Sequence, residues 1–448
     1  MAKATTPILA RPERLAGQSP VRVAAQLRHL PGLVFFDTAG NLPASAGPSV
    51  SVIAARPARV MRGSIHSAAD RAMLGDVLKQ GVTQLDAPAG PMVGPAFPLG
   101  GLCGWVTYEG DFVFGEFPEM LVFNHADSAW TEIGRLSECL RETEDEPEDK
   151  SVVIGPFVAA TGRDLFLRGV ERIHEWIRAG DIYQVNLSHA FVAEVAGGSL
   201  FRLYESLRAA TPAPMATWLS LDGKEVLSSS PELFLKISGR CVETRPIKGT
   251  RPRFADPADD RRAAYDLQTS TKEIAELVMI TDLLRNDLGQ VCEFGSVQVA
   301  EMLQLESLAQ VHHLVSTITG ALRPDLQVID ALAACFPGGS ITGAPKKRAM
   351  EIIRELEHSP RGIYCGAIGW VGYNGESSFN LAIRTLVRDG SKLIYQVGAG
   401  IVADSDPAEE YEETLHKAAG IRLAISRHKG EGSAGQAWPH GSSHGPTA

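Results

Sequence analysis

A chain of 448 residues, 44% of them hydrophobic, is long enough for roughly two or three domains or one large one, and its composition is that of an ordinary globular protein. The formal net charge of -10 at pH 7 disfavours general nucleic-acid binding, so a basic patch would be a local feature. The expected anionic partner is therefore a small metabolite.

The cysteines are scattered along the chain without a CxxC pair. This spacing fits reduced thiols better than a disulfide framework or a zinc site, and it points to the cytoplasm. The first residues lack the apolar segment of a secretion signal, and no run of about 18 apolar residues occurs. We therefore predict neither secretion nor membrane insertion.

Residues 21–136 alternate short β-like runs with glycine and proline. Two such runs are Leu33–Phe36 and Val50–Ala54, and the aromatic segment Gly100–Tyr108 follows them. This alternation predicts a mixed α+β region.

An acidic segment, Arg141–Lys150, predicts an exposed linker before a strand pattern resumes at Ser151–Val158. The end of the chain is rich in Gly, Ser, Pro and His and has little to bury. We expect an N-terminal region over 1–150, a second region over 151–428 and a disordered tail over 429–448.

The second region begins with apolar residues at helical spacing, which predict a helix over Thr161–Ala179 that ends at Gly180. The alternating segment Asp181–Ser188 then predicts a strand. Helix followed by strand recurs through the rest of the chain.

A lone lysine, Lys248, lies beside Gly249 and among Arg245, Arg251 and Arg253. We interpret Lys248 as a candidate nucleophile, because nearby arginines would oppose its positive charge and favour the reactive amine. The same arginines would attract an anion. The alternative is a solvated loop or a phosphate-binding patch.

Acidic pairs at helical spacing occur in two predicted helices. In the first, Glu273 and Glu276 share one face, and Gly289 marks the expected end. Ser270 and Glu273 also fit a capping box, which by itself would explain Glu273. Glu276 has no such structural explanation.

The second acidic helix begins at Asp406, where Glu409 fits a capping box, and it carries the pair Glu410 and Glu413. Two such pairs brought face to face would form an oxygen-only site of the kind that Mg²⁺ prefers. Acidic pairs on helices are more often solvated faces, so spacing alone leaves both interpretations open.

Taken together, the motifs of residues 161–427 resemble the chorismate-utilising enzymes, and within them the component I subunits of aminodeoxychorismate synthases. The motifs that carry this resemblance are Gly180–Asn186, Ser230–Phe234, Arg245–Arg253, Asp282–Asp287, Phe336–Lys346 and Gly398–Val402. The resemblance implies an α+β fold of two packed antiparallel β-sheets flanked by helices. Residues 1–150 would be the N-terminal component I region, packed on a chorismate-binding catalytic domain over 151–428.

Two positions of this family favour amination through a covalent intermediate. Anthranilate synthases usually have alanine at the position of Lys248, and isochorismate synthases place a water-activating lysine at that of Gln184. The resemblance implies that Lys248 attacks C2 of chorismate while the C4 hydroxyl leaves, and that ammonia then adds at C4. Glu232 matches the general acid that protonates the departing oxygen.

The resemblance also implies a Mg²⁺ cofactor, with Glu276 and Glu413 as direct ligands and Glu273 and Glu410 acting through water. Arg384 matches the residue that pairs with the enolpyruvyl carboxylate. The other matches to substrate-contacting positions are Gly249, Thr250, His313, Tyr364, Gly398, Ala399 and Gly400. For His313 a packed core position is the alternative.

No cysteine lies in a Gly-x-Cys-x-Gly elbow, so we expect ammonia from a separate glutamine amidotransferase subunit or from solution. The predicted function is the amination of chorismate to 4-amino-4-deoxychorismate in the cytoplasm, on the way to para-aminobenzoate and folate. One alternative is anthranilate synthase component I. The other is a non-catalytic subunit that binds chorismate or senses tryptophan, although Thr38 and Thr211–Ala216 depart from the family's tryptophan-binding segments.

Overall fold

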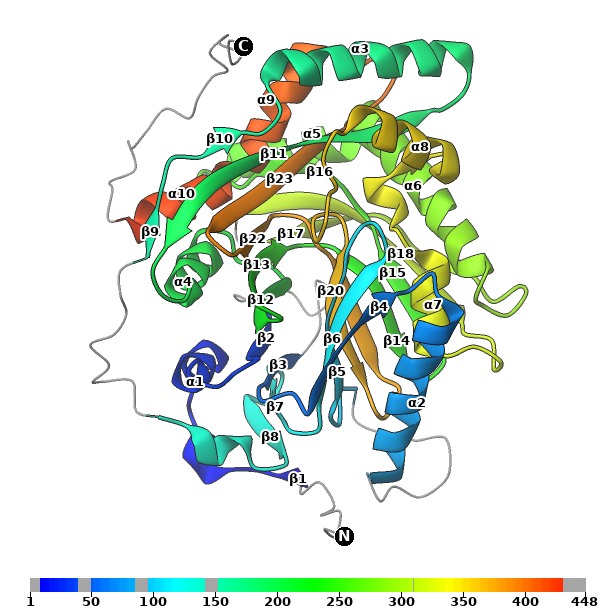
Figure 1. The fold of residues 1–448 in the computed structure, drawn as a ribbon. Coiled ribbons are helices and arrows are strands. Elements are labelled where there is room, and N and C mark those ends of the chain that lie inside the picture. The colour runs from blue at the N-terminus through cyan, green and yellow to red at the C-terminus, as the bar shows by residue number, and fades with distance from the viewer. Residues whose placement is uncertain (1–8, 39–49, 85–95, 142–151, 309, 430–448) are drawn as a thin grey trace.

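The computed structural model describes residues 9–38, 50–84, 96–141, 152–308 and 310–429. The expected linker and tail lie outside these residues, except for Arg141 and Lys429. Two large β-sheets form the centre of the protein, with helices around them (Figure 1). Every strand pair in both sheets is antiparallel, which confirms the predicted α+β class.

The first sheet runs, in spatial order, through β1 (Leu9–Ala10), β8 (Ala129–Ile133), β7 (Met120–Asn124), β3 (Val50–Ala54), β2 (Val34–Asp37), β12 (Met215–Leu221), β13 (Lys224–Ser230), β22 (Thr385–Asp389), β23 (Lys392–Ile401), β11 (Gln184–Ala196) and β10 (Val158–Ala159). Two short strands, β9 (Val153–Ile154) and β19 (Gly343–Ala344), pair with β11 beside this path.

The second sheet runs through β16 (Ile247–Pro252), β18 (Val311–Ala321), β15 (Cys241–Arg245), β14 (Leu233–Ser238), β21 (Ser377–Leu381), β20 (Ala367–Gly372), β5 (Gly101–Val106), β6 (Asp111–Phe117) and β4 (Arg59–Ser64), with β17 (Gln298–Ser307) paired to β18. Strands from both sides of residue 150 therefore share each sheet, and β5 is the strand that bridges them in the second.

The sheets pack on each other because some strands are apolar on both faces. On β5, Cys103 and Trp105 belong to a hydrophobic cluster that includes residues of the first sheet such as Val52, whereas Leu102 and Val106 belong to the core under the helices. The aromatic segment expected around residues 100–108 is thus a fully buried strand.

The helices cover the outer faces of the sheets and meet the long strands β11 and β23 (Figure 1). Their bounds are α1 (Pro20–Leu27), α2 (Ala68–Gln84), α3 (Arg163–Ala179), α4 (Phe201–Ala210), α5 (Pro257–Thr269), α6 (Thr271–Gly289), α7 (Val328–Cys335), α8 (Lys346–Leu356), α9 (Pro407–Lys417) and α10 (Ala419–His428). Short 3-10 turns are η1 (Glu13–Leu15), η2 (Leu136–Cys139) and η4 (Gly339–Ile341).

Three predicted helix ends are confirmed. Helix α3 ends at Gly180, which has φ of +83° and satisfies the last carbonyls from a left-handed conformation that glycine adopts without strain. Helix α6 begins after Ser270, whose side chain accepts from the Glu273 backbone, and α9 begins after Asp406, which caps two backbone N–H groups.

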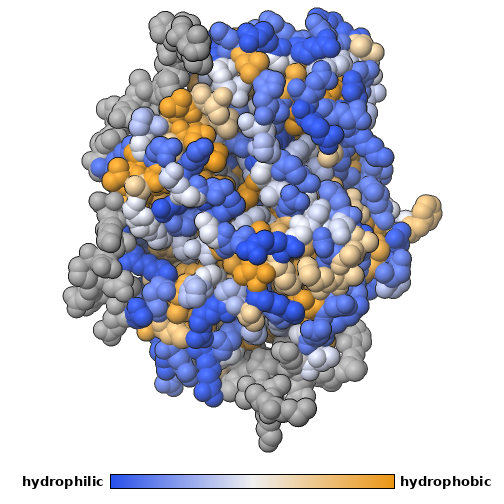
Figure 2. Space-filling model, in the orientation of Figure 1, coloured by the Kyte–Doolittle hydropathy of each residue, from blue (hydrophilic) through white to orange (hydrophobic). Residues whose placement is uncertain are grey.

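The face of the molecule shown in Figure 2 is mainly hydrophilic, with hydrophobic residues in small patches. Among the residues that the structure describes, no helix is both long enough and apolar enough to cross a membrane.

Candidate active site

A cavity of about 760 Å³ collects the sequence-predicted residues. It lies where β11, β16, β18 and β23 meet α6, α9 and the turn η4. The predicted residues that line it are Glu232, Lys248, Gly249, Thr250, Glu273, Glu276, His313, Tyr364, Arg384, Gly398, Gly400, Glu410 and Glu413. Ala399 differs, because its side chain belongs to the adjoining hydrophobic core.

Glu232 is a buried carboxyl group at the turn between β13 and β14, and only 4% of it is exposed. The Ser340 hydroxyl donates a hydrogen bond of 2.6 Å to Glu232 Oε1. Burial raises the pKa of Glu232 to about 7, although Ser340, Lys248 and Arg384 act in the opposite direction. Near neutral pH, Glu232 can therefore hold a proton and release it, as a general acid must.

Lys248 projects from β16 at a bulge in its pairing with β18. Its Nζ atom lies 3.8 Å from Glu276 Oε2, and its charge also acts on Glu232 and Glu413. The cavity thus surrounds the lysine with carboxyl groups.

The arginines around Lys248 do not act as the sequence predicted. Arg245 pairs with Glu306, Arg251 Nη1 lies 3.4 Å from Glu273 Oε1, and Arg253 Nε lies 2.8 Å from Asp260 Oδ1. Each arginine charge is balanced by a carboxylate, so the expectation that they crowd Lys248 is wrong. The pairing carboxylates come from distant segments, which the local sequence could not reveal.

Gly249 has φ of +70°, a region that other residues rarely adopt. A Cβ atom there would lie 2.6 Å from Leu267 Cδ1 and 3.0 Å from Glu273 Oε2. The glycine therefore lets the backbone of β16 approach α5 and α6, rather than only making room beside the lysine.

Replacing Gly249 with alanine is expected to lower the free energy of unfolding by roughly 1–3 kcal/mol, because backbone strain and these close contacts combine. Urea denaturation measures the change. Gly289→Ala is the matched control, since a Cβ there meets nothing within 4 Å. Equal stability of the two variants would contradict the assigned role of Gly249.

The four glutamates of α6 and α9 converge on the same cavity, as the resemblance implies. Each is paired with a cationic side chain: Glu276 with Lys248, Glu273 with Arg251, Glu410 with Lys272 at 3.4 Å, and Glu413 with Lys417 at 2.8 Å. Ser405 also donates to Glu410 at 2.6 Å.

These carboxylates interact electrostatically. Burial raises the pKa of Glu276, and the like charges of Glu273 and Glu413 add to this effect, while Lys248 and Lys272 oppose it. At Glu413 the burial effect is outweighed, because Lys417, Lys272 and Lys248 lower its pKa. A divalent cation would relieve the repulsion that raises the pKa of Glu276.

The donor set fits Mg²⁺ in chemical type, because all four side chains offer carboxylate oxygens. Across the described ranges, however, no three His, Cys, Asp or Glu side chains are grouped closely enough to hold a metal ion. Binding of Mg²⁺ would therefore require the proposed direct ligands, Glu276 and Glu413, to exchange their lysine partners for the metal.

His313 is a neutral hydrogen-bond acceptor facing the cavity. Burial, the largest influence, lowers its pKa to about 4. Its Nδ1 atom lies 3.2 Å from the Gly249 carbonyl and 3.0 Å from the Thr250 hydroxyl. The carbonyl can only accept, so the tautomer with its proton on Nδ1 is the one that satisfies both contacts. The Nε2 atom is buried without a protein partner and keeps its lone pair. A substrate hydroxyl could donate to it.

Arg384 supplies a half-buried cation beside Glu232. Its φ is +51°, an uncommon conformation for a residue with a side chain. Burial lowers its pKa, although Glu232 opposes the effect. In the part of the chain that the structure describes, no carboxylate lies within ion-pair distance of Arg384. Its guanidinium group is thus available to an anionic ligand.

Several residues of the wall were not singled out from the sequence. The most informative is Ser340, which lies in the recognised segment Phe336–Lys346 but was assigned no role there. Asn186 and His416 also line the cavity. A hydroxyl in a glycine-rich turn carries no local signal of its distant carboxyl partner.

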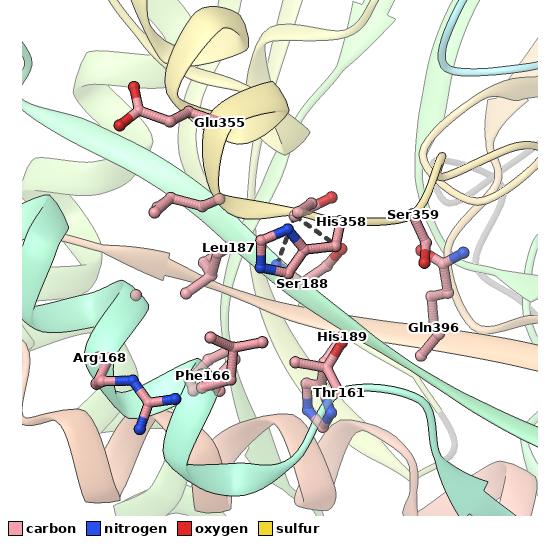
Figure 3. Close-up of a pocket in the computed structure, with 15 residues that line it drawn as sticks. Thr161, Phe166, Arg168, Leu187, Ser188, His189, Glu355, His358, Ser359 and Gln396 are labelled. Atoms are coloured by element: carbon pink, nitrogen blue, oxygen red, sulfur yellow. Dashed lines mark hydrogen bonds between the residues drawn. The ribbon is translucent and has the colours of Figure 1, made fainter. Parts of the chain in front are cut away.

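A second, smaller cavity of about 140 Å³ lies between α3, β11 and the end of α8 (Figure 3). His358, His189 and Arg168 line it, and none of the predicted site residues does. Gln396 borders both cavities.

Comparison with known proteins gives a consistent result. The sequence model of one family, described as "chorismate binding enzyme", matches residues 102–422. Anthranilate synthase component 1 of Methanothermobacter thermautotrophicus is 39% identical over 75% of this chain and 76% of its own length. Aminodeoxychorismate synthase component 1 of Bacillus subtilis is 38% identical over 70% and 71% of the two chains.

Among solved structures, anthranilate synthase component I from Streptococcus pneumoniae TIGR4 superposes with a TM-score of 0.72 at 29% identity. The superposition covers 85% of this chain and 94% of that protein. Relatives with two different names are therefore similar to this chain in sequence, and a solved structure with one of those names is similar to it in fold.

Proposed function

The chain belongs to the chorismate-binding enzyme family, and on that premise we propose that it aminates chorismate at C4 to give 4-amino-4-deoxychorismate. The observation that carries the proposal is the placement of Lys248 in one cavity with Glu232 and Arg384. A nucleophile and a protonated acid together exceed what simple binding requires.

In the proposed reaction, the neutral amine of Lys248 attacks C2 of the ring, and the double bond shifts as the C4 hydroxyl departs. Glu232 gives its proton to that oxygen, so water leaves. Ammonia then adds at C4, the double bond shifts back, and the C2–N bond to Lys248 breaks as the lysine nitrogen takes up a proton from solvent. The new C4 ammonium group gives one proton back to Glu232. The proton that the lysine loses on attack passes to solvent, because Glu276, 3.8 Å from Lys248, is assigned to the metal.

Arg384, His313 and Mg²⁺ are proposed to orient the substrate in the cavity. Arg384 pairs with the enolpyruvyl carboxylate through its planar fork, and His313 Nε2 accepts from the C4 hydroxyl of the bound substrate before that group leaves. Mg²⁺, held by Glu276 and Glu413 with Glu273 and Glu410 acting through water, would offset the charge of the ring carboxylate when bound.

The ammonia source is proposed to be a separate glutamine amidotransferase subunit. Support comes from the names of the relatives, since both the Bacillus subtilis and the Methanothermobacter proteins are called component 1 of a synthase. Anthranilate synthase component I is the second candidate function, because relatives of that name match this chain at least as well.

Product analysis separates the two candidates. The purified chain is supplied with chorismate, Mg²⁺ and ammonium, and the product is identified by mass. We expect 4-amino-4-deoxychorismate, which keeps the enolpyruvyl group. Anthranilate, which has lost pyruvate, would instead establish the second candidate.

The pH dependence of turnover is expected to follow the proton on Glu232. Because the acid must be protonated and its pKa is about 7, kcat/KM for chorismate should fall as pH rises through that value. Initial rates measured between pH 5.5 and 9 test this expectation. The concentration of uncharged ammonia is kept saturating at every pH. A profile without a descending limb would exclude Glu232 as the proton donor.

A further inference from the structure

Arg361 is a buried arginine just after α8, and no predicted motif assigned it a role. Only 3% of it is exposed. Its Nε and Nη2 donate to the two carboxylate oxygens of Glu357, at 2.8 and 2.7 Å. Nη1 donates to the Ile341 carbonyl at 2.9 Å and Nη2 to the Asn186 carbonyl at 2.7 Å. The guanidinium also lies 4.5 Å from the ring centroid of Tyr108.

Both carbonyls belong to residues that line the larger cavity. Ile341 ends the turn η4, and its neighbour Ser340 donates to Glu232. Asn186 lies on β11, opposite Gly400 of β23. Arg361 therefore joins the turn that contacts the proposed acid to a neighbouring strand that also lines the cavity.

Glu357 fixes this arrangement from the other side. Its Oε1 atom accepts from the Ser188 backbone at 2.8 Å and from the Ser188 hydroxyl at 2.9 Å, beside the smaller cavity (Figure 3). Glu357 thus holds Arg361 and β11 at once. The Arg361 guanidinium and the Glu357 carboxylate therefore bind each other and also bind groups of β11.

The main effect of such a buried ion pair is to orient neighbouring groups, and its contribution to stability is small. A buried ion pair gains little net stability over apolar residues, since the cost of removing both charges from water offsets their attraction. What Arg361 adds is a rigid fork that sets three groups at fixed angles. A lysine would keep the charge but could not reproduce that geometry.

We propose that Arg361 is a positioning residue, which holds η4 against β11 so that the Ser340 hydroxyl stays on the Glu232 carboxyl group. The inference deepens the proposed function, because Glu232 is the proposed proton donor. Besides Ser340, the groups that face Glu232 are Lys248 on β16, Arg384 before β22 and Cys365 before β20.

The test is a double-variant cycle with Ser340→Ala and Arg361→Lys, read by the titration of Glu232 itself. Glutamate is labelled with ¹³C at the carboxyl carbon, and the Glu232 resonance is assigned by its loss in Glu232→Gln. The Ser340 hydrogen bond favours the charged carboxylate, so its loss should raise the pKa of Glu232 by about one unit.

Arg361→Lys is also expected to raise the pKa of Glu232. The pKa in the double variant should be no higher than in Ser340→Ala alone, because both changes act through the same Ser340–Glu232 hydrogen bond. Arg348→Lys, a change at a partly exposed arginine of α8 paired with Asp181, should leave the titration unchanged. Thermal unfolding of every variant is measured alongside.

A lower melting temperature in Arg361→Lys without a change in the Glu232 titration would overturn the proposal, as would additive effects. If Arg361→Lys does not fold, Glu357→Gln takes its place in the cycle. A smaller rise in the pKa of Glu232 is then expected, and an unchanged pKa would contradict the proposal. The titration needs no substrate, so its outcome is separate from whether the chain aminates chorismate.

Discussion

Replacing Lys248 with alanine is expected to reduce formation of 4-amino-4-deoxychorismate by roughly 10³-fold or more, the scale seen when one member of a catalytic set is removed. The covalent route is lost, because no other lysine is proposed to reach the ring. Glu232 and Arg384 remain to bind chorismate and protonate its hydroxyl. Weak direct addition of ammonia at C2, the anthranilate-type outcome, is the expected residual activity.

Lys272→Ala is the matched control for Lys248→Ala. Lys272 lines the same cavity, and it pairs with Glu410 at 3.4 Å, so its removal takes away one positive charge without removing the proposed nucleophile. We expect a loss of about tenfold at most from this charge. Comparable losses in the two variants would reduce Lys248 to a residue that only holds an anion.

Direct evidence for the covalent step comes from mass spectrometry. Wild-type protein incubated with chorismate and Mg²⁺ but without ammonia should carry an adduct on the peptide that contains Lys248. The Lys248→Ala variant should lack this adduct. Undiminished production of 4-amino-4-deoxychorismate by the variant would end the nucleophile hypothesis.

Replacing Glu276 or Glu413 with alanine is expected to abolish turnover that depends on Mg²⁺, because each change removes a proposed direct ligand. The fold should persist, since both side chains line a cavity. Glu273→Ala should be milder in activity, because Glu273 is proposed to act through water.

Mg²⁺ binding has a readout that is separate from activity. If Mg²⁺ binds the folded protein, it should raise the melting temperature of the wild type as its concentration increases. Glu276→Ala and Glu413→Ala should lose this increase, and Glu412→Ala, an exposed change on the same helix α9, should keep it. Full activity with unchanged Mg²⁺ dependence in either ligand variant would show that the metal assignment is wrong.

The sequence alone determined the local elements of the catalytic region and the residue types of the cavity. Apolar spacing and Gly180 predicted α3, and the caps Ser270 and Asp406 predicted the starts of α6 and α9. These features depend on neighbours within one or two turns of helix, so they can be read from a short stretch of sequence.

Only the tertiary structure decided what each charged group contacts. The three arginines near Lys248 pair with Glu306, Glu273 and Asp260, and Glu232 gains its hydrogen bond from Ser340, 108 residues away in the sequence. Which strands share a sheet was settled in the same way, because β5 and β20 pair although more than 200 residues separate them. Burial and long-range packing set the pKa of Glu232 and the hydrogen-bond partners of the Arg361 guanidinium. No local sequence pattern encodes either property, because the interacting groups come from distant segments of the chain.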